Sequence, residues 1–117
     1  MSILEALINS DPTTIIVTRH VQMPSAGGYS WVETDLPPQT VRLYNISPRN
    51  QSQMTLPEGD IRNITLGIVA TASGDFGVSH GSYDTFLHQG RTYRVVGVRH
   101  YDDLTIEEHI QADCVAV

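Results

Sequence analysis

Hydrophobic and polar residues alternate with a period of two along most of this 117-residue chain. The clearest case is "NITLGIVATA", residues 63–72, where one face carries Ile64, Leu66, Ile68, Ala70 and Ala72. Such alternation is typical of a β-strand with one buried face. Similar patterns occur in "TTIIVTRHVQM" (residues 13–23), "QTVRLYNI" (residues 39–46) and "HIQADCVAV" (residues 109–117), with a shorter strand-like piece around Trp31.

The pattern changes to a helical one only at the N-terminus. Ser2 and Glu5 have the spacing of a capping box, and Ile3, Leu4, Leu7 and Ile8 form an apolar stripe. A short helix over residues 2–9 is therefore expected, and it must end before Pro12. The whole chain, residues 1–117, is predicted to be a single all-β domain, a small antiparallel barrel or sandwich of six or seven strands.

Residues 45–63, "NISPRNQSQMTLPEGDIRN", interrupt the alternating pattern. They are polar and contain two prolines, and they lie between two strand-like segments. Long irregular connections in compact domains are usually functional or disordered. We expect one long inserted loop here.

The charge and cysteine content limit the classes of function. Thirteen acidic residues face seven arginines and no lysine, a formal charge of −6, which is a poor balance for binding nucleic acid. The single cysteine, Cys114, leaves no internal disulfide and fits a reducing compartment. The N-terminus lacks the features of a signal peptide, and no apolar run is long enough to cross a membrane.

Reactive chemistry is weakly indicated. His80, His88, His100 and His109 are scattered and lack the paired spacing of zinc ligands. The group Ser79, His80 and Asp84, the pair Asp102–Asp103 and the "DFG" of residues 75–77 are each better explained as loop residues. We expect no enzyme, cofactor or metal. A mixture of tyrosines and arginines leaves open a small OB-like binding module: Tyr83, Tyr93, Tyr101, Arg91, Arg94 and Arg99.

The segment "YDTFLHQGRTYRVVGVRHY", residues 83–101, predicts two strands joined at Gln89-Gly90. Its second strand resembles the "Gly-Arg-x-Tyr-x-Val" hairpin of the head-closure (stopper, or head–tail joining) proteins of long-tailed bacteriophages. The residues that match this pattern are Gly90, Arg91, Tyr93, Val95 and Val98. The resemblance extends over residues 13–117, although its motifs are short.

The resemblance implies a structural protein of the virion neck, assembled in the host cytoplasm, that forms a homo-oligomeric ring. Such a ring lies below the portal and adaptor, retains the packaged DNA and offers a docking surface for the tail terminator or tail tube. DNA passes through its channel without specific binding, and a tail-completion or tail-terminator ring is the alternative within the same assembly. Residues 45–63 would then supply the channel or assembly loop: Ser47, Arg49, Asn50, Gln51, Ser52, Gln53, Met54, Glu58 and Asp60.

Overall fold

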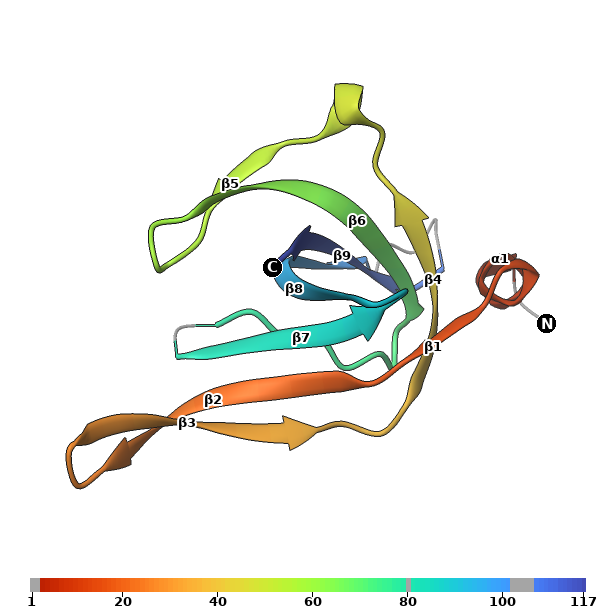
Figure 1. Ribbon diagram of the computed structural model, residues 1–117. Helices are drawn as coiled ribbons and strands as arrows, with labels where there is room; N and C mark the ends of the chain where they lie inside the picture. The colour runs from red at the N-terminus through yellow and green to blue at the C-terminus, as the bar shows by residue number, and fades with distance from the viewer. Residues whose placement is uncertain (1–2, 80, 102–106) are drawn as a thin grey trace.

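The computed structural model describes residues 3–79, 81–101 and 107–117, which form an all-β fold with one short α-helix (Figure 1). The elements are α1 (Ile3–Ser10), β1 (Thr13–Ile15), β2 (Val17–Ser25), β3 (Gly28–Asp35), β4 (Gln39–Asn45), the 3-10 helix η1 (Pro48–Asn50), β5 (Gln53–Thr55), β6 (Ile61–Thr71), β7 (Ser82–His88), β8 (Arg91–Tyr101) and β9 (His109–Ala116).

The strands form one curled antiparallel sheet in the order β1-β4-β6-β9-β8-β7-β2-β3, and β5 pairs with β6 (Figure 1). Strands β1 and β2 follow each other directly, with only Ile16 between them. Because β1 pairs with β4 while β2 pairs with β7, this stretch connects the two ends of the curl. The predicted all-β, barrel-like class with an N-terminal helix is therefore confirmed. The strand count exceeds the six or seven expected because β1 and β5 are only three residues long.

The main core fills the inside of the curled sheet. The alternation that predicted the strands also predicts this face: Leu66, Ile68 and Ala70 on β6 are buried, and Ala112 and Cys114 lie beside them on β9. Two predicted members of this face do not join them. Ala72 follows the end of β6 at Thr71, and the register shift between Ile64 and Leu66 turns Ile64 to the other face of the sheet. Burial raises the pKa of the Cys114 thiol, as expected for a group surrounded by aliphatic side chains.

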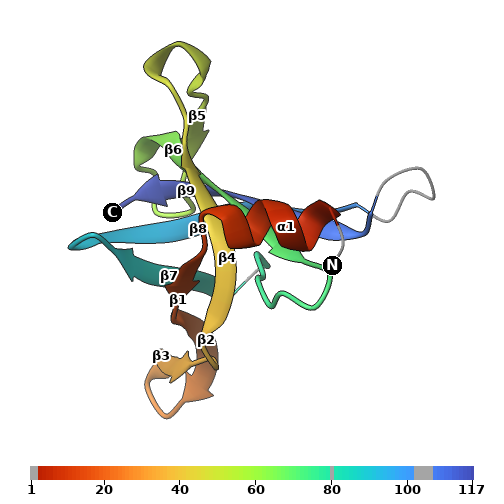
Figure 2. The ribbon, with the colours of Figure 1, turned by 90° about the vertical axis from the view of Figure 1, so that its right-hand side faces the viewer.

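Helix α1 lies beside β4 and β6 at the side of the sheet (Figure 2). Ile8 is buried, and the Leu7 carbonyl accepts hydrogen bonds from the Ser10 hydroxyl and, at 3.4 Å, from the Arg42 guanidinium. The helix thus covers one side of the core, and it ends at Ser10, one residue later than predicted; the predicted first residue, Ser2, lies outside the described residues. Within the described part of the chain, no helix has the length and apolar content that crossing a membrane requires.

Residues 45–63 are not the single irregular loop that the polar sequence predicts. They contain η1, all of β5 and the first residues of β6. The β5–β6 turn is tight, with hydrogen bonds from the Leu56 amide to the Asp60 carbonyl and from the Gly59 amide to the Leu56 carbonyl, both 2.8 Å. Gly59 has a φ of +98°, which favours glycine.

The β5–β6 hairpin folds because it has an apolar side of its own. Leu56 is buried against Val96 and Val115, and Met54 and Ile64 pack around them. These residues form a second, smaller core on the other face of the sheet from Cys114. Two apolar residues two positions apart, Met54 and Leu56, were the sequence signal that the polar surroundings obscured.

The predicted turn at Gln89-Gly90 is confirmed. Both residues have positive φ values, +51° and +77°, as a two-residue type I′ hairpin requires. The turn connects β7 and β8, and it places Phe86 opposite Tyr93 with the two rings stacked at 5.7 Å.

Replacing Phe86 with alanine should lower the free energy of unfolding by about 3–5 kcal/mol, because its ring is buried in the main core. The matched control is Leu87→Ala on the neighbouring position, whose side chain points outward and is 65% exposed. The control should change stability by less than about 0.5 kcal/mol. Urea denaturation followed by circular dichroism measures both, and equal losses would contradict the assignment of the inner face.

Candidate assembly surfaces

A buried ion pair joins β2 to β7. Asp84 is completely buried, and its two carboxylate oxygens accept hydrogen bonds from the Arg19 guanidinium at 2.9 and 3.0 Å. The same carboxylate accepts a hydrogen bond from the Gly77 amide at 2.8 Å, and Arg19 also reaches Asp75 at 3.0 Å. The hydrogen bond with Asp84 is the main reason that the pKa of Arg19 is raised above its ordinary value.

This network gives a structural role to several residues whose types and spacing had suggested catalysis. Asp84 has its oxygens occupied by structural donors, and Phe76 of the "DFG" stretch is buried in the core. Asp75 is held by the Gln39 side chain, which contacts both its amide and its carbonyl. The segment that follows β6 is thus anchored to the sheet. His80, Asp102 and Asp103 lie outside the described residues.

The described histidines occupy separate aromatic environments. His20 stacks on Tyr83 at 4.4 Å, His109 stacks on Tyr101 at 4.8 Å, and His88 lies 6.4 Å from Tyr93. His100 is exposed on β8. No group of three or more potential metal ligands is found in the portions of the chain that are described.

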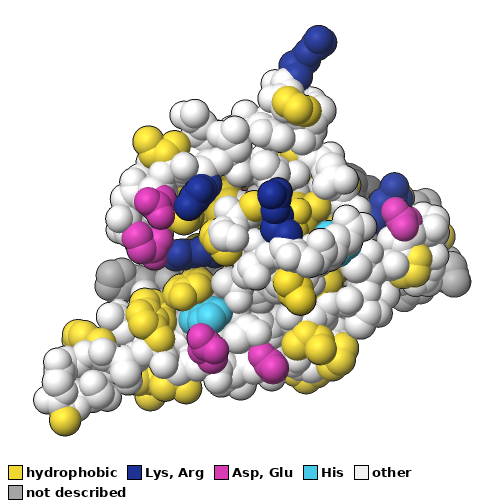
Figure 3. Space-filling model, in the orientation of Figure 1, with side chains coloured by type: hydrophobic (Ala, Val, Ile, Leu, Met, Phe, Trp, Pro, Cys, Tyr) yellow, Lys and Arg dark blue, Asp and Glu magenta, His cyan; other side chains and the backbone are white. Residues whose placement is uncertain are grey.

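A groove of about 330 Å³ lies between the β5–β6 turn and strands β2, β7 and β8. Arg94 is central to it: its guanidinium lies 4.1 Å from the centre of the Tyr83 ring and donates two hydrogen bonds to Glu58, at 2.9 and 3.0 Å. Figure 3 shows acidic and basic side chains gathered where the hairpin faces β7. This pair fastens the hairpin turn to the sheet and lowers the pKa of Glu58.

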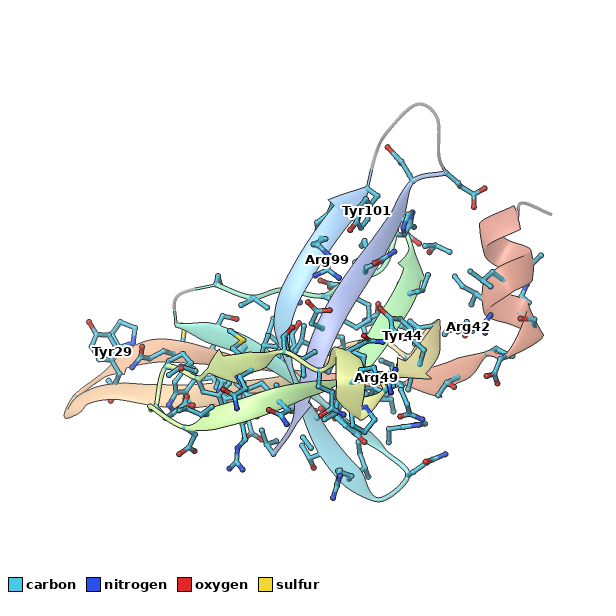
Figure 4. The ribbon with its side chains drawn as sticks, turned by 90° about the horizontal axis from the view of Figure 1, so that it is seen from above. Tyr29, Arg42, Tyr44, Arg49, Arg99 and Tyr101 are labelled. Atoms are coloured by element: carbon cyan, nitrogen blue, oxygen red, sulfur yellow. The ribbon has the colours of Figure 1, made fainter. Side chains whose placement is uncertain are left out.

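The outer face of β4, β6, β9 and β8 carries arginines and tyrosines. Strand register places Arg42, Val69, Gln111 and Arg99 in one row, and Tyr44, Gly67, Asp113 and Gly97 in the next. We name this surface the arginine–tyrosine face, defined by Arg42, Tyr44, Arg99 and Tyr101 (Figure 4). Arg49 overlaps it in this view from above, but η1 lies apart from it at the top of the molecule in Figures 1 and 2.

Within the arginine–tyrosine face, the Tyr44 ring lies directly over Gly67, where any side chain would collide with it. Desolvation raises the pKa of Tyr44, and the charge of Asp113 adds to the effect. Asp113 itself accepts hydrogen bonds from Arg99 at 2.6 and 3.2 Å. The face is thus held in place by contacts across four strands, while Tyr44 remains 37% exposed.

The loop candidates at the start of residues 45–63 form a local network. The Asn50 amide bonds to the Ser47 carbonyl at 2.9 Å, and the Gln51 side chain bonds to the Ile46 carbonyl at 3.1 Å. The Ser52 carbonyl accepts a hydrogen bond from the Ile64 amide at 2.8 Å.

The remaining candidates of residues 45–63 differ in their contacts: some pack or pair within the fold, and Arg49 does not pair with a described carboxylate. Gln53 pairs with Asn63 in the hairpin, and Met54 packs in the smaller core. Glu58 binds Arg94, and Asp60 lies 3.8 Å from Arg62. Arg49 is exposed and has no carboxylate partner among the residues described.

The residues of the head-closure-like hairpin have mainly structural positions. Gly90 makes the turn, Val95 is buried, and Tyr93 and Val98 pack against the main core. Arg91 is exposed beside the turn. The tyrosines and arginines of the binding-module hypothesis do not form one surface, because Arg94 and Arg99 are each paired with a carboxylate.

The most exposed part of the sheet is a feature that the sequence pattern missed. Strand β3 pairs with β2 alone, and all eight of its residues are exposed. We name β3 and the part of β2 that pairs only with it, residues 22–35, the β2–β3 arm; it projects from the body in Figure 1. The sequence feature that could have indicated this hairpin is Ala26-Gly27-Gly28. Ala26 and Gly27 form its two-residue loop, and Gly28, which follows them, has a φ of +124°.

The odd-numbered positions of β3 share one face of the arm. Tyr29 is 70% exposed and Trp31 49% exposed, and Glu33 and Asp35 continue the row toward the body. Trp31 also contacts the Tyr83 ring edge-on at 5.1 Å. We name Tyr29, Trp31, Glu33 and Asp35 the aromatic–acidic stripe.

Searches of protein-family models and of curated proteins find no match to this chain.

Replacing Asp84 with asparagine should lower the free energy of unfolding by about 3 kcal/mol, because the buried site loses the charged acceptor of the hydrogen bonds from Arg19 and the Gly77 amide. The matched control is Asp75→Asn, which removes the exposed partner of the same arginine and should cost less than about 1 kcal/mol. Urea denaturation measures both variants. A larger loss for Asp75→Asn would place the anchoring interaction at the surface instead.

The Glu58 carboxyl should titrate below its ordinary pKa in a carbon-detected NMR titration, and Arg94→Gln should bring the pKa back up. A lowered pKa in the folded chain means that the pair stabilises the fold above the ordinary glutamate pKa and loses this effect as the pH falls through the lowered value. The control Arg62→Gln should leave the Glu58 pKa unchanged, since Arg62 faces Asp60. If Arg62→Gln has the larger effect, Arg94 is not the partner in solution.

Proposed function

We propose that this chain is a non-enzymatic head-closure protein of a tailed-phage neck, which acts as a homo-oligomeric ring between the portal–adaptor complex and the tail. The observation that carries the proposal is the β2–β3 arm, which extends from a well-packed body and leaves large apolar side chains unburied. Exposed apolar groups on a projecting strand are typical of surfaces that bind other proteins. The resemblance of residues 90–98 to the head-closure hairpin is the reason for proposing the phage neck as the assembly.

The architecture supports a structural role for a second reason. The main core, the smaller core under the β5–β6 hairpin and the Arg19–Asp84 pair give a rigid body with projections at both ends. Figure 2 shows the β5 end and the β3 end on opposite sides of that body. Two different surfaces on one subunit are what a ring of identical copies requires, because each copy contacts two neighbours through different patches.

We propose the hairpin of residues 45–63 as the segment that approaches the ring's channel. Ser47, Asn50, Gln51, Ser52 and Gln53 are polar and uncharged, which gives passing DNA few charged groups to bind. Arg49 is an exposed cation of the segment, while Glu58 and Asp60 at its turn lie beside Arg94 and Arg62. The glycine-rich segment before β7 suits this role less, because Phe76 and the Gly77 amide hold it to the core.

Two other functions are compatible with the same fold. A tail-completion or tail-terminator protein would form the next ring of the same assembly. A small OB-like binding module would use tyrosines and arginines of the mixture in residues 83–101, such as Tyr101 and the exposed Arg91, to hold single-stranded nucleic acid. The net charge of −6 favours the ring proteins over the binding module.

The test is to delete the gene in its phage or prophage and examine the heads produced. We expect heads that lose packaged DNA and carry no tails, and purified protein should restore both nuclease protection and tail attachment. Heads that keep their DNA but lack tails would assign the tail-completion role instead. Normal virions, together with salt-dependent binding of the purified protein to a single-stranded oligonucleotide, would contradict the proposal and favour the binding module.

A further inference from the structure

We propose that the β2–β3 arm of one copy binds the arginine–tyrosine face of the next copy, so that this contact repeats from subunit to subunit. The inference rests on the proposed function and specifies which surfaces of the chain meet in the ring. It follows from the chemistry of the two surfaces and from their positions on the body.

The aromatic–acidic stripe on the arm lacks partners that would satisfy it within one copy. Tyr29 and Trp31 expose large rings, and Glu33, with its side chain 66% exposed, is paired among the described residues only with His20, at 3.4 Å. Asp35 accepts one hydrogen bond, from the Thr18 hydroxyl at 2.7 Å. Residues 22–35 contain no lysine or arginine, so every charged group of the arm is negative.

The arginine–tyrosine face is the chemical complement of this stripe. The Arg42 guanidinium contacts only neutral acceptors, the Leu7 carbonyl and the Ser10 hydroxyl at 3.4 and 3.5 Å, within the described structure. The face therefore offers the Arg42 guanidinium to bind a carboxylate, next to the exposed ring of Tyr44 on the same strand.

The types of side chain on the two surfaces match pairwise. Arginine binds carboxylates with directed hydrogen bonds and stacks on the faces of tryptophan and tyrosine. Trp, Tyr and Arg are also the residues that contribute most often to the affinity of protein interfaces. A carboxylate of the stripe, Glu33 or Asp35, can thus pair with Arg42, while the rings of the stripe pack beside Tyr44.

The arrangement on the body excludes an internal contact. Figure 4 shows Tyr29 at the far end of the arm, while Arg42, Tyr44, Arg99 and Tyr101 lie over the strands on the other side of the molecule. Eight paired positions hold β2 and β3 together, so the arm cannot fold back onto its own face without breaking the hairpin. The occupant is a second copy, and the contact is heterologous.

The experiment uses two variants of the full chain, each with one surface disabled. The arm variant is Trp31→Ser with Glu33→Arg, and the face variant is Arg42→Glu. Analytical ultracentrifugation should show each variant as a monomer at protein concentrations where the wild type forms larger species. An equimolar mixture should give a 1:1 dimer and nothing larger, because one intact arm and one intact face remain available.

Matched controls separate this contact from general surface effects. Val32→Ser changes an exposed residue on the opposite side of the arm, and Arg91→Glu removes an exposed arginine outside the face. Both controls should assemble like the wild type. Circular dichroism should show that all variants are folded, as expected for substitutions at surface positions.

The possible results distinguish this inference from the proposed function. If the wild type forms rings and either disabled variant still does so, the arm–face contact is wrong while the ring function stands. A mixture that yields only monomers, or species larger than a dimer, also overturns the contact. If the face variant assembles normally but loses salt-dependent binding to a single-stranded oligonucleotide, the face binds nucleic acid and the arm–face contact is wrong. A wild type that stays monomeric, even on DNA-filled heads, contradicts the ring itself.

Discussion

The buried pair between Arg19 and Asp84 is the constraint on which the rest of this structure depends. Asp84 is fully buried, and an ionised carboxylate in that position is tolerable only with a compensating charge and hydrogen bonds to its remaining oxygen sites. Arg19 supplies the charge, and the Gly77 amide supplies a further donor. One carboxylate therefore fixes β2 against β7 and fastens the segment before β7 to the sheet. Since the arm is the continuation of β2, its direction is set by the same contact.

A second constraint determines how the other face of the sheet is packed. Strand β6 is eleven residues long, and its register with β9 is interrupted between Ile64 and Leu66. The residues before this irregularity pair with β5, and the hairpin buries Leu56 on Val96 and Val115. One strand thus contributes to two cores on opposite faces. The paired Arg94 and Glu58 hold the hairpin turn beside Tyr83, which limits how far it can move in an isolated subunit.

The two constraints relate the fold to the proposed assembly. A sheet packed on both faces provides a stiff body, and stiffness lowers the entropy that subunits lose when they associate. The surfaces left outside this packing are the β2–β3 arm and the arginine–tyrosine face. Their chemistry is different and complementary, which suits a repeated contact with one direction. Tyr44 shows how the body and the surface are coupled, because its ring fills the space above Gly67 and still presents an exposed edge.

The sequence by itself determined the all-β class, the N-terminal helix, the turn at Gln89-Gly90 and the inward faces of β6 and β9. These features follow from local periodicity and backbone preference, which neighbouring residues carry. Only the tertiary structure decided that Arg19 meets Asp84, 65 positions away, and that Leu56 finds a second core. It also decided that β3 has a single partner strand and projects as an arm. Such contacts depend on which strands become neighbours, and alternation specifies the two faces of a strand without specifying its partner.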